Sequence, residues 1–220
     1  MARLTPALFH FLNELRDNNS GEWFQANKPR FEAEVRGPLL AFIQAFAEPL
    51  DGLNRHFLAD PRLQGGSMFR INRDIRFSLD KSPYKTNVGA QFRHRDCTKD
   101  VHAPAFYLHL EPGRCLAGAG MWHPDPPTLK TIREYMLAHP RAWKALAGLG
   151  VTGDTVTRVP LGLAQDHPLA EGLRLKDYYT VTPLTQAQVC APDFLATFTE
   201  SCRASLPLMK FLSQALALPW

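Results

Sequence analysis

Apolar side chains recur every three or four positions through the first sixty residues, which is the spacing of one face of an α-helix. A Thr5-Pro6 pair supplies a capping side chain and a proline for the first helical turn. Ser20 can cap a second, short helix, a third begins at Asn27-Lys-Pro29, and Gly37-Pro38 is expected to separate it from a fourth. Residues 1–60 are therefore predicted to be helical. The apolar positions of the first and fourth helices are Leu8, Phe11, Leu12, Leu15, Leu39, Leu40, Ile43, Phe46 and Leu50.

From about residue 65 the pattern changes to short apolar runs, several of them alternating, which are typical of β-strands. Four such runs are predicted to form one antiparallel sheet within residues 65–125. In the third run Tyr107 and His109 share a face, because alternate residues of a strand point the same way. Glu111-Pro-Gly113 is a tight-turn signal between the third and fourth runs. The four runs are Met68–Ile71, Val88–Phe92, Ala105–Leu110 and Cys115–Trp122.

Helical spacing returns in residues 126–220. A helix is expected to begin at Pro126-Pro127 and to be broken at His139-Pro140. The C-terminal helical region starts at Thr185 or Pro192, and Pro207 is predicted to kink or divide it.

A small insert is expected near residues 150–185, where Val156–Val159 and Tyr178–Val181 read as a minor ribbon. The order of helices, sheet and helices predicts an α+β fold. A chain of 220 residues is also short enough to form one domain, spanning residues 1–220.

The composition is that of an ordinary globular protein, with 45% apolar residues. Residues 1–20 do not resemble a signal peptide, and no apolar run reaches the ~18–20 residues of a membrane helix. The four cysteines are scattered, without the close spacing of a zinc site or a disulfide framework. We therefore expect a cytoplasmic protein with reduced thiols and no membrane partner; the oligomeric state is left open.

Positive charge is concentrated in one segment of the chain. Between Arg62 and Lys99 there are nine Lys or Arg and three Asp, a net charge of +6, whereas the whole chain carries +4. A local basic field attracts anions such as phosphates, nucleotides or nucleic acid. The charge distribution therefore predicts an anionic partner, with a small molecule favoured and nucleic acid kept as an alternative.

The centre of this basic segment, residues 68–86, carries the candidate site. Guanidinium groups are planar, permanently charged and bidentate, so they suit carboxylate or phosphate recognition. Arg73, Arg76, Lys81 and Lys85 are predicted to converge on an anion, together with Asp80, Tyr84 and Trp122. The alternative is architectural: Arg73–Asp80 or Arg76–Asp74 ion pairs would attach a loop to the sheet.

Other chemistry is weakly signalled. Asp74 and Asp80 could bind a cation, but Asp80 and Lys81 are adjacent and would point to opposite faces of a strand, unlike a metal nuclease. No metal site is predicted from the scattered histidines, and no cofactor or catalytic residue is assigned. Gly118-x-Gly120-x-Trp122 admits two interpretations: a ligand passing over the glycines beside Trp122, or helices packed closely on them.

The basic segment also carries a family resemblance. Arg73-Asp-x-Arg-Phe-Ser-x-Asp-Lys-x-Pro-Tyr-Lys-Thr86 resembles the signature of a widespread family of conserved hypothetical proteins, grouped as a domain of unknown function. Phe11-Leu-x-x-Leu-x-x-Asn-Asn19 and Ala117-Gly-Ala-Gly-Met-Trp122 agree with it. The resemblance extends over nearly the whole chain and implies an α+β single-domain fold. It implies no activity.

These observations predict a pocket for a phosphorylated or carboxylated small molecule, open to a catalytic role. It should lie at one edge or end of the sheet, with Trp23 and Trp122 as walls. The alternatives are a protein that binds or processes nucleic acid, and a structural or interaction module held by an internal ion-pair network.

Overall fold

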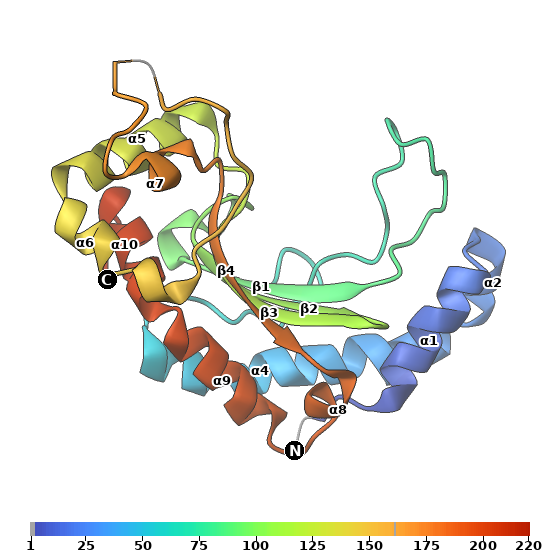
Figure 1. The fold of residues 1–220 in the computed structure, drawn as a ribbon. Coiled ribbons are helices and arrows are strands. Elements are labelled where there is room, and N and C mark those ends of the chain that lie inside the picture. Colours follow the sequence, from blue (N-terminus) through green and yellow to red (C-terminus); the bar gives the residue numbers. More distant parts are fainter. Residues whose placement is uncertain (1–2, 161) are drawn as a thin grey trace.

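The computed structural model describes residues 3–160 and 162–220 and has an α+β fold (Figure 1). Helices occupy the N-terminal part, a four-stranded antiparallel sheet lies in the middle, and helices return at the C-terminus. This is the predicted fold class. None of the helices within the described residues is long and apolar enough to cross a bilayer.

The N-terminal helices follow the predicted starts. Helix α1 (Pro6–Asp17) follows Thr5, and α2 (Gly21–Ala26) is capped by the Ser20 side chain, which accepts the Trp23 N–H. The expected break at Gly37-Pro38 is wrong. Helix α3 (Lys28–Arg30), the π-helical η1 (Phe31–Arg36) and α4 (Gly37–Leu53) follow one another without interruption. Pro38 lacks an N–H, and the wide π-turn, in which Gly37 N–H donates to the carbonyl of Glu32, carries the chain past it.

The sheet has the order β1-β2-β3-β4 with every neighbour antiparallel. Three strands match predicted runs: β1 (Val88–Arg93), β2 (Ala105–Glu111) and β3 (Arg114–Met121). The prediction of a strand at the first run, Met68–Ile71, is wrong. That segment runs along the outer edge of β1, where Phe69 N–H donates to the Gly89 carbonyl and Gln91 N–H to the Ser67 carbonyl. It therefore covers the sheet edge without extending the ladder.

The fourth strand is β4 (Tyr178–Leu184), which pairs with β3 from Met121↔Tyr178 to Cys115↔Leu184. The predicted minor ribbon is thus wrong for Tyr178–Val181, because these residues belong to the central sheet. The preceding segment forms an isolated bridge with the start of β4 at Thr152↔Tyr179, and a second one, Thr155↔Leu175, lies just before the strand. The sequence pattern could not distinguish pairing with residues 156–159 from pairing with β3, because the same alternation of side chains fits both.

Most C-terminal helices begin where proline and capping signals placed them, but the short helix Ala170–Arg174 lies in the segment that was expected to be an insert with a ribbon. Pro207 lies in the first turn of the last helix and so divides this region, as predicted. The helices are α5 (Pro126–Ala138), α6 (Pro140–Lys144), α7 (Ala170–Arg174), α8 (Gln186–Val189), α9 (Phe194–Ala204) and α10 (Leu206–Ala215), with short 3-10 turns η2 (Arg95–Cys97) and η3 (Ala147–Leu149).

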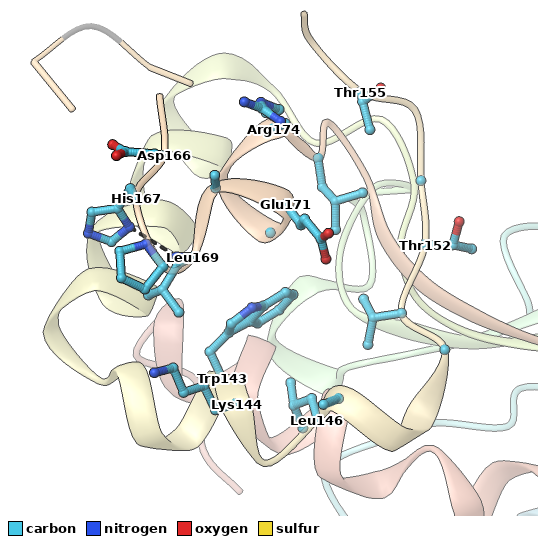
Figure 2. A pocket seen from close by; sticks show the side chains of 18 residues that line it. Trp143, Lys144, Leu146, Thr152, Thr155, Asp166, His167, Leu169, Glu171 and Arg174 are labelled. Carbon is cyan, nitrogen blue, oxygen red and sulfur yellow. Dashed lines mark hydrogen bonds between the residues drawn. The ribbon is translucent and has the colours of Figure 1, made fainter. Parts of the chain in front are cut away.

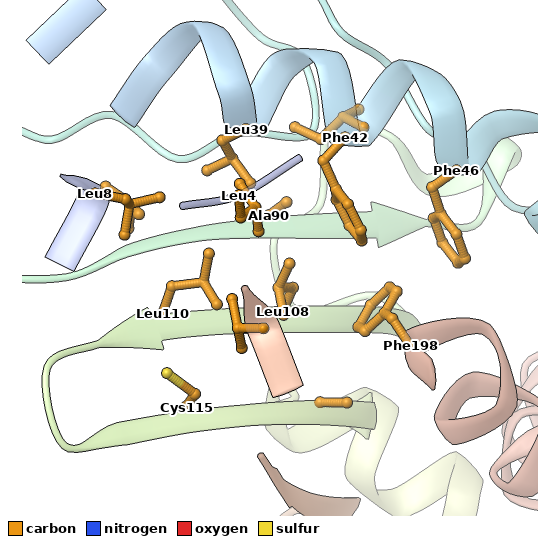
Figure 3. Close-up of a cluster of buried hydrophobic side chains, with 14 of the residues drawn as sticks. Leu4, Leu8, Leu39, Phe42, Phe46, Ala90, Leu108, Leu110, Cys115 and Phe198 are labelled. Carbon is orange, nitrogen blue, oxygen red and sulfur yellow. The ribbon is translucent and has the colours of Figure 1, made fainter. Parts of the chain in front are cut away.

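One face of the sheet is buried under helices. Phe106, Leu108 and Leu110 of β2 point to this face and are fully buried. Figure 3 shows Leu108 and Leu110 on the side of the sheet that faces Phe42 and Phe46 of α4. The Phe46 ring lies 4.7 Å from that of Phe92 and 4.9 Å from that of Phe198 of α9. Burying a side chain of this size contributes about 1.5–3 kcal/mol, so this layer supplies much of the stability of the fold.

The opposite face of the sheet carries no helical layer across its centre. In Figure 1 it is the upper face, between a protruding loop on one side and the segment around α5–α7 on the other. Tyr107 and His109 of β2 point to this face and are only partly buried. We call it the open face.

Candidate functional site

A long loop, residues 70–85, rises from the edge of β1 beside the open face (Figure 1); we call it the arm. The two ends of the arm pair with each other, since Arg73 N–H donates to the Pro83 carbonyl (2.9 Å) and Lys85 N–H to the Ile71 carbonyl (2.8 Å). The base of the arm is thus fixed in position next to the sheet.

Tyr84 attaches this base to the N-terminal helices. Its backbone N–H and carbonyl both bond the Asn19 side-chain amide, at 3.1 and 3.0 Å. Its ring stacks on Phe24 with centroids 4.1 Å apart. Tyr84 is buried in this contact, so its side chain faces α2.

Both ion pairs considered from the sequence are present, but they lie on the exposed part of the arm. Arg73 bonds Asp80, and Arg76 bonds Asp74 at 2.7 Å. The Arg76 side chain lowers the pKa of Asp74 to about 2. Bonds from Ser82, and then from Arg73, lower the pKa of Asp80.

The remaining contacts of the arm are made within the loop. Lys81 Nζ donates to the Ile75 carbonyl at 3.0 Å. At the tip of the arm, Phe77 and Leu79 are 96% and 101% exposed. Arg76, Asp80 and Lys81 therefore lie along a solvated loop.

A cavity of about 510 Å³ lies between the base of the arm and the open face. Three of the sequence-predicted site residues, Arg73, Lys85 and Trp122, line it. It also takes in residues that were not assigned to the site from the sequence. These are Phe69, Arg70, Asp74, Asn87, Val88, Gly89, Tyr107 and His109.

Two of the cations at this cavity are unpaired. The ion pairs of the arm engage Arg73 and Arg76, which leaves Arg70 and Lys85 without an acidic partner among the residues that the structure describes. Lys85 is half-buried, with Nζ 5.6 Å from the centre of the Phe69 ring. Burial, and then the charge of Arg70, lower the pKa of Lys85 below its usual 10.5. The cavity is therefore lined by two cations that form no ion pair within the described residues, with the Asp74 carboxylate as an acidic neighbour of Arg70.

Three polar side chains of β2 are linked in a line, and two of them, Tyr107 and His109, line the cavity. The hydroxyl of Tyr107 lies 3.0 Å from Nδ1 of His109, and Nε2 of His109 lies 3.1 Å from a carboxylate oxygen of Glu111. Burial raises the pKa of Tyr107 to about 12. The alternation of side chains along a strand correctly predicted that Tyr107 and His109 share a face. The same alternation also places Glu111 on that face, but from the sequence Glu111 was interpreted only as part of a turn.

Trp122 forms a side wall of the cavity and is 61% exposed. Its carbonyl accepts a hydrogen bond from His102 Nδ1 (2.8 Å), and its ring lies 4.1 Å from that of His123. The buried carboxylate of Asp177 accepts the backbone N–H of His123 at 2.6 Å, which fixes the chain just after Trp122. Trp23 packs on Phe11 instead (5.6 Å), away from this cavity.

The two glycines before Trp122 have different roles. A Cβ on Gly120 would lie 2.1 Å from the Tyr178 carbonyl oxygen, and its φ of +135° suits glycine alone. Gly118 faces Tyr107 and the Thr180 carbonyl. The helices cover the face of Ala117 and Ala119, not that of Gly118. The interpretation in which helices pack on the glycines is therefore wrong.

A second, larger cavity of about 930 Å³ lies between α6 and α7 (Figure 2). Trp143 lies at its base, close against Gly172 of α7. Its rim mixes charges of both signs, with Lys144 and Arg174 against Asp166 and Glu171. Because the charged side chains around this cavity are of both signs, they do not indicate whether a ligand would be an anion or a cation. The cavity beside the arm gives the clearer indication.

No group of three or more His, Cys, Asp or Glu residues is arranged to hold a metal ion within residues 3–160 and 162–220. The chemistry available at the arm cavity is therefore that of its own cations and of the Tyr107–His109–Glu111 line.

Comparison with known families identifies the chain. The model of a family described as conserved hypothetical protein (DUF2461) matches residues 7–211. The chain belongs to this family. No curated protein matches it. The match takes in all four strands and the arm, so the fold and the candidate site lie within the family region.

Proposed function

We propose that this protein binds a small phosphorylated or carboxylated molecule in the cavity between the arm and the open face. The observation that carries the proposal is the pair of cations, Arg70 and Lys85, which share this cavity without an acidic partner among the described residues. Arg70 is exposed and adds a second positive charge at the cavity. Lys85 is half-buried, and a charge in such a position is rarely left without a compensating group, because desolvation penalises it. A bound anion would supply that group.

The shape and composition of the cavity support a small ligand. Its volume of about 510 Å³ lies within the ~300–1,000 Å³ usual for small-molecule sites. Arg70 offers planar donors for a bidentate contact, Arg73 adds positive charge at the wall, and Trp122 and Phe69 offer apolar surface. Of the residues predicted from the sequence, Arg73, Lys85 and Trp122 contribute to this proposal.

The proposal is tested by the stabilisation that inorganic phosphate and a set of dicarboxylates give in a thermal-shift titration. A ligand that binds only the native state raises Tm as its concentration passes Kd. We expect stabilisation of the wild type, and its loss in Lys85→Gln and Arg70→Gln. Lys81→Gln is the matched control, because Lys81 lies on the same arm but bonds the Ile75 carbonyl outside the cavity.

Stabilisation that survives both Lys85→Gln and Arg70→Gln would contradict the proposal. Short oligonucleotides are included in the same titration. If they alone stabilise the protein, and do so less as salt rises, the partner is nucleic acid instead, since phosphate contacts release counterions.

A further inference from the structure

The Tyr107–His109–Glu111 line has a directional hydrogen-bond arrangement. An ionised carboxylate can only accept, so Glu111 requires a proton on Nε2 of the neutral His109 ring. Nδ1 is then the acceptor, and the Tyr107 hydroxyl donates to it. Within the described residues the Tyr107 oxygen accepts no hydrogen bond, and Tyr107 lines the cavity. The group of the line that can accept a proton therefore belongs to a residue next to the space where a ligand would lie.

Glycine flanks this line on both neighbouring strands. Gly118 of β3 lies opposite Tyr107, and Gly89 of β1 lies opposite His109. A Cβ on Gly89 would come within 3.0 Å of the Tyr107 hydroxyl oxygen. A larger residue at position 89 would therefore crowd the Tyr107 hydroxyl, whereas a Cβ on Gly118 would make only ordinary contacts with Cβ and Cδ1 of Tyr107. Glycine within a strand commonly marks such a close approach.

We propose that Tyr107, His109 and Glu111 form a proton relay, and that the arm cavity is the active site of an enzyme that removes a proton from a carbon next to a carbonyl in an anionic substrate. This inference rests on the proposed anion binding. The substrate class is a 2-oxo acid or a ketone that carries a phosphate.

The proton balance of the step is complete within these residues. The substrate C–H bond breaks, and its proton passes to the Tyr107 oxygen while the Tyr107 proton passes to Nδ1 of His109. The electron pair stays on the substrate as an enolate, next to Arg70 and Lys85. The imidazolium that forms is balanced by the Glu111 carboxylate. Return of the proton, to the same carbon or another, completes an exchange or an isomerisation, so no oxidant or co-reactant is needed.

The surroundings of Tyr107 suit this role. The groups that act on its ionisation are its own burial, which raises the pKa to about 12, the charge of Arg114, which lowers it, and that of Glu111, which raises it. Such a phenol holds its proton at neutral pH and gives it up only as it gains another. The side chain of His109 is 13% exposed and that of Glu111 is 30% exposed, so water has limited access to the relay.

The test measures deuterium incorporation from deuterium oxide into pyruvate, 2-oxoglutarate and dihydroxyacetone phosphate by proton NMR. We expect the wild type to exchange at least one probe. Tyr107→Phe keeps the ring and should lower the rate by about 100-fold or more, the usual contribution of a general acid–base group. Tyr84→Phe is the matched control, because that ring stacks on Phe24 outside the cavity.

Glu111 acts through His109 and is a positioning residue. Glu111→Ala should lower the exchange rate and also change the nitrogen-15 shifts of His109, because Nε2 loses the acceptor that fixes its proton. A merely structural role for Glu111 would leave the tautomer unchanged. Phosphate stabilisation is measured for every variant and should persist in Tyr107→Phe and Glu111→Ala, which shows that each is folded with its anion site intact.

Failure of the proton relay can be distinguished from failure of the anion-binding proposal. If phosphate stabilises the wild type but no probe is exchanged above the rate without protein, the relay is not catalytic and only the binding proposal stands. If exchange persists in Tyr107→Phe, the relay is overturned. If phosphate does not stabilise the wild type, the proposed anion binding fails, whatever the exchange rate shows.

Discussion

At the scale of single residues, the sequence indicated the right kind of chemistry but not all of the residues that carry it. Arg73 and Lys85 line the cavity, whereas Arg76 and Lys81 are engaged within the arm. The difference is one of side-chain direction in an irregular loop, which no periodicity fixes. Arg70 was seen as part of the basic cluster, but only the fold shows it beside Lys85.

Lys85 provides a prediction at this scale. Since its folded pKa is lowered, the unfolded chain binds more protons between that pKa and 10.5, so the charge of Lys85 opposes folding at neutral pH. Lys85→Met should therefore raise Tm by about 2 °C at pH 7 without ligand, a change typical for less than 1 kcal/mol in a chain of this length. The gain should shrink as pH rises toward 10.5.

The same residue sets the pH dependence of anion binding. Wild-type affinity for phosphate should fall as pH rises through the lowered pKa of Lys85, because the amine loses its charge. Calorimetric titration between pH 7 and pH 10 measures this. An affinity that stays constant over the range would show that Lys85 does not contact the anion.

At the scale of elements, the arm is a solvated loop attached at its base. Its ion pairs have side chains that are 26–76% exposed, and surface pairs contribute little to stability. The attachment is made by Tyr84, which is buried against Phe24 and bonded by Asn19. The sequence left open that ion pairs attach this loop to the sheet. In the structure, Tyr84 is the residue that chiefly attaches it.

This difference predicts the outcome of substitutions in the arm. Arg73→Ala and Asp80→Ala should leave Tm within about 2 °C of the wild type, as expected for exposed pairs. Tyr84→Ala should destabilise the protein by about 3–5 kcal/mol, as loss of a buried aromatic ring does. Thermal denaturation measures the first change, and urea denaturation measures the second. Unfolding of Arg73→Ala or Asp80→Ala at room temperature would instead favour the ion-pair scaffold.

At the scale of the whole molecule, helices cover one face of the sheet and leave the other for the candidate site. The buried layer contains Phe42 and Phe46 of α4 against β1 and β2, with Phe198 of α9 (Figure 3). The relay residues lie on the same strand as the core residues, one position apart. A rigid strand of this kind keeps Tyr107 and His109 in register with the cations of the arm.

Phe46 tests this division of the sheet into two faces. Phe46→Ala should cost about 3–5 kcal/mol of stability, because it leaves a cavity among fully buried rings. Below its own Tm, the variant should still bind phosphate with wild-type affinity, since the open face is unchanged. Loss of binding by a variant shown to be folded would indicate that the two faces are coupled.

The sequence by itself determined the α+β class, the starts of most helices and strands β1 to β3, because helix caps, prolines and alternation are local signals. It also located the basic segment. Only the tertiary structure decided that Tyr178–Leu184 completes the sheet while Met68–Ile71 runs along its edge, since strand partners depend on packing between distant segments. For the same reason, only the fold showed the cavity in which Arg70, Lys85 and the Tyr107–His109–Glu111 line meet. Their proximity is created by an arm and a strand that are more than twenty residues apart in the chain.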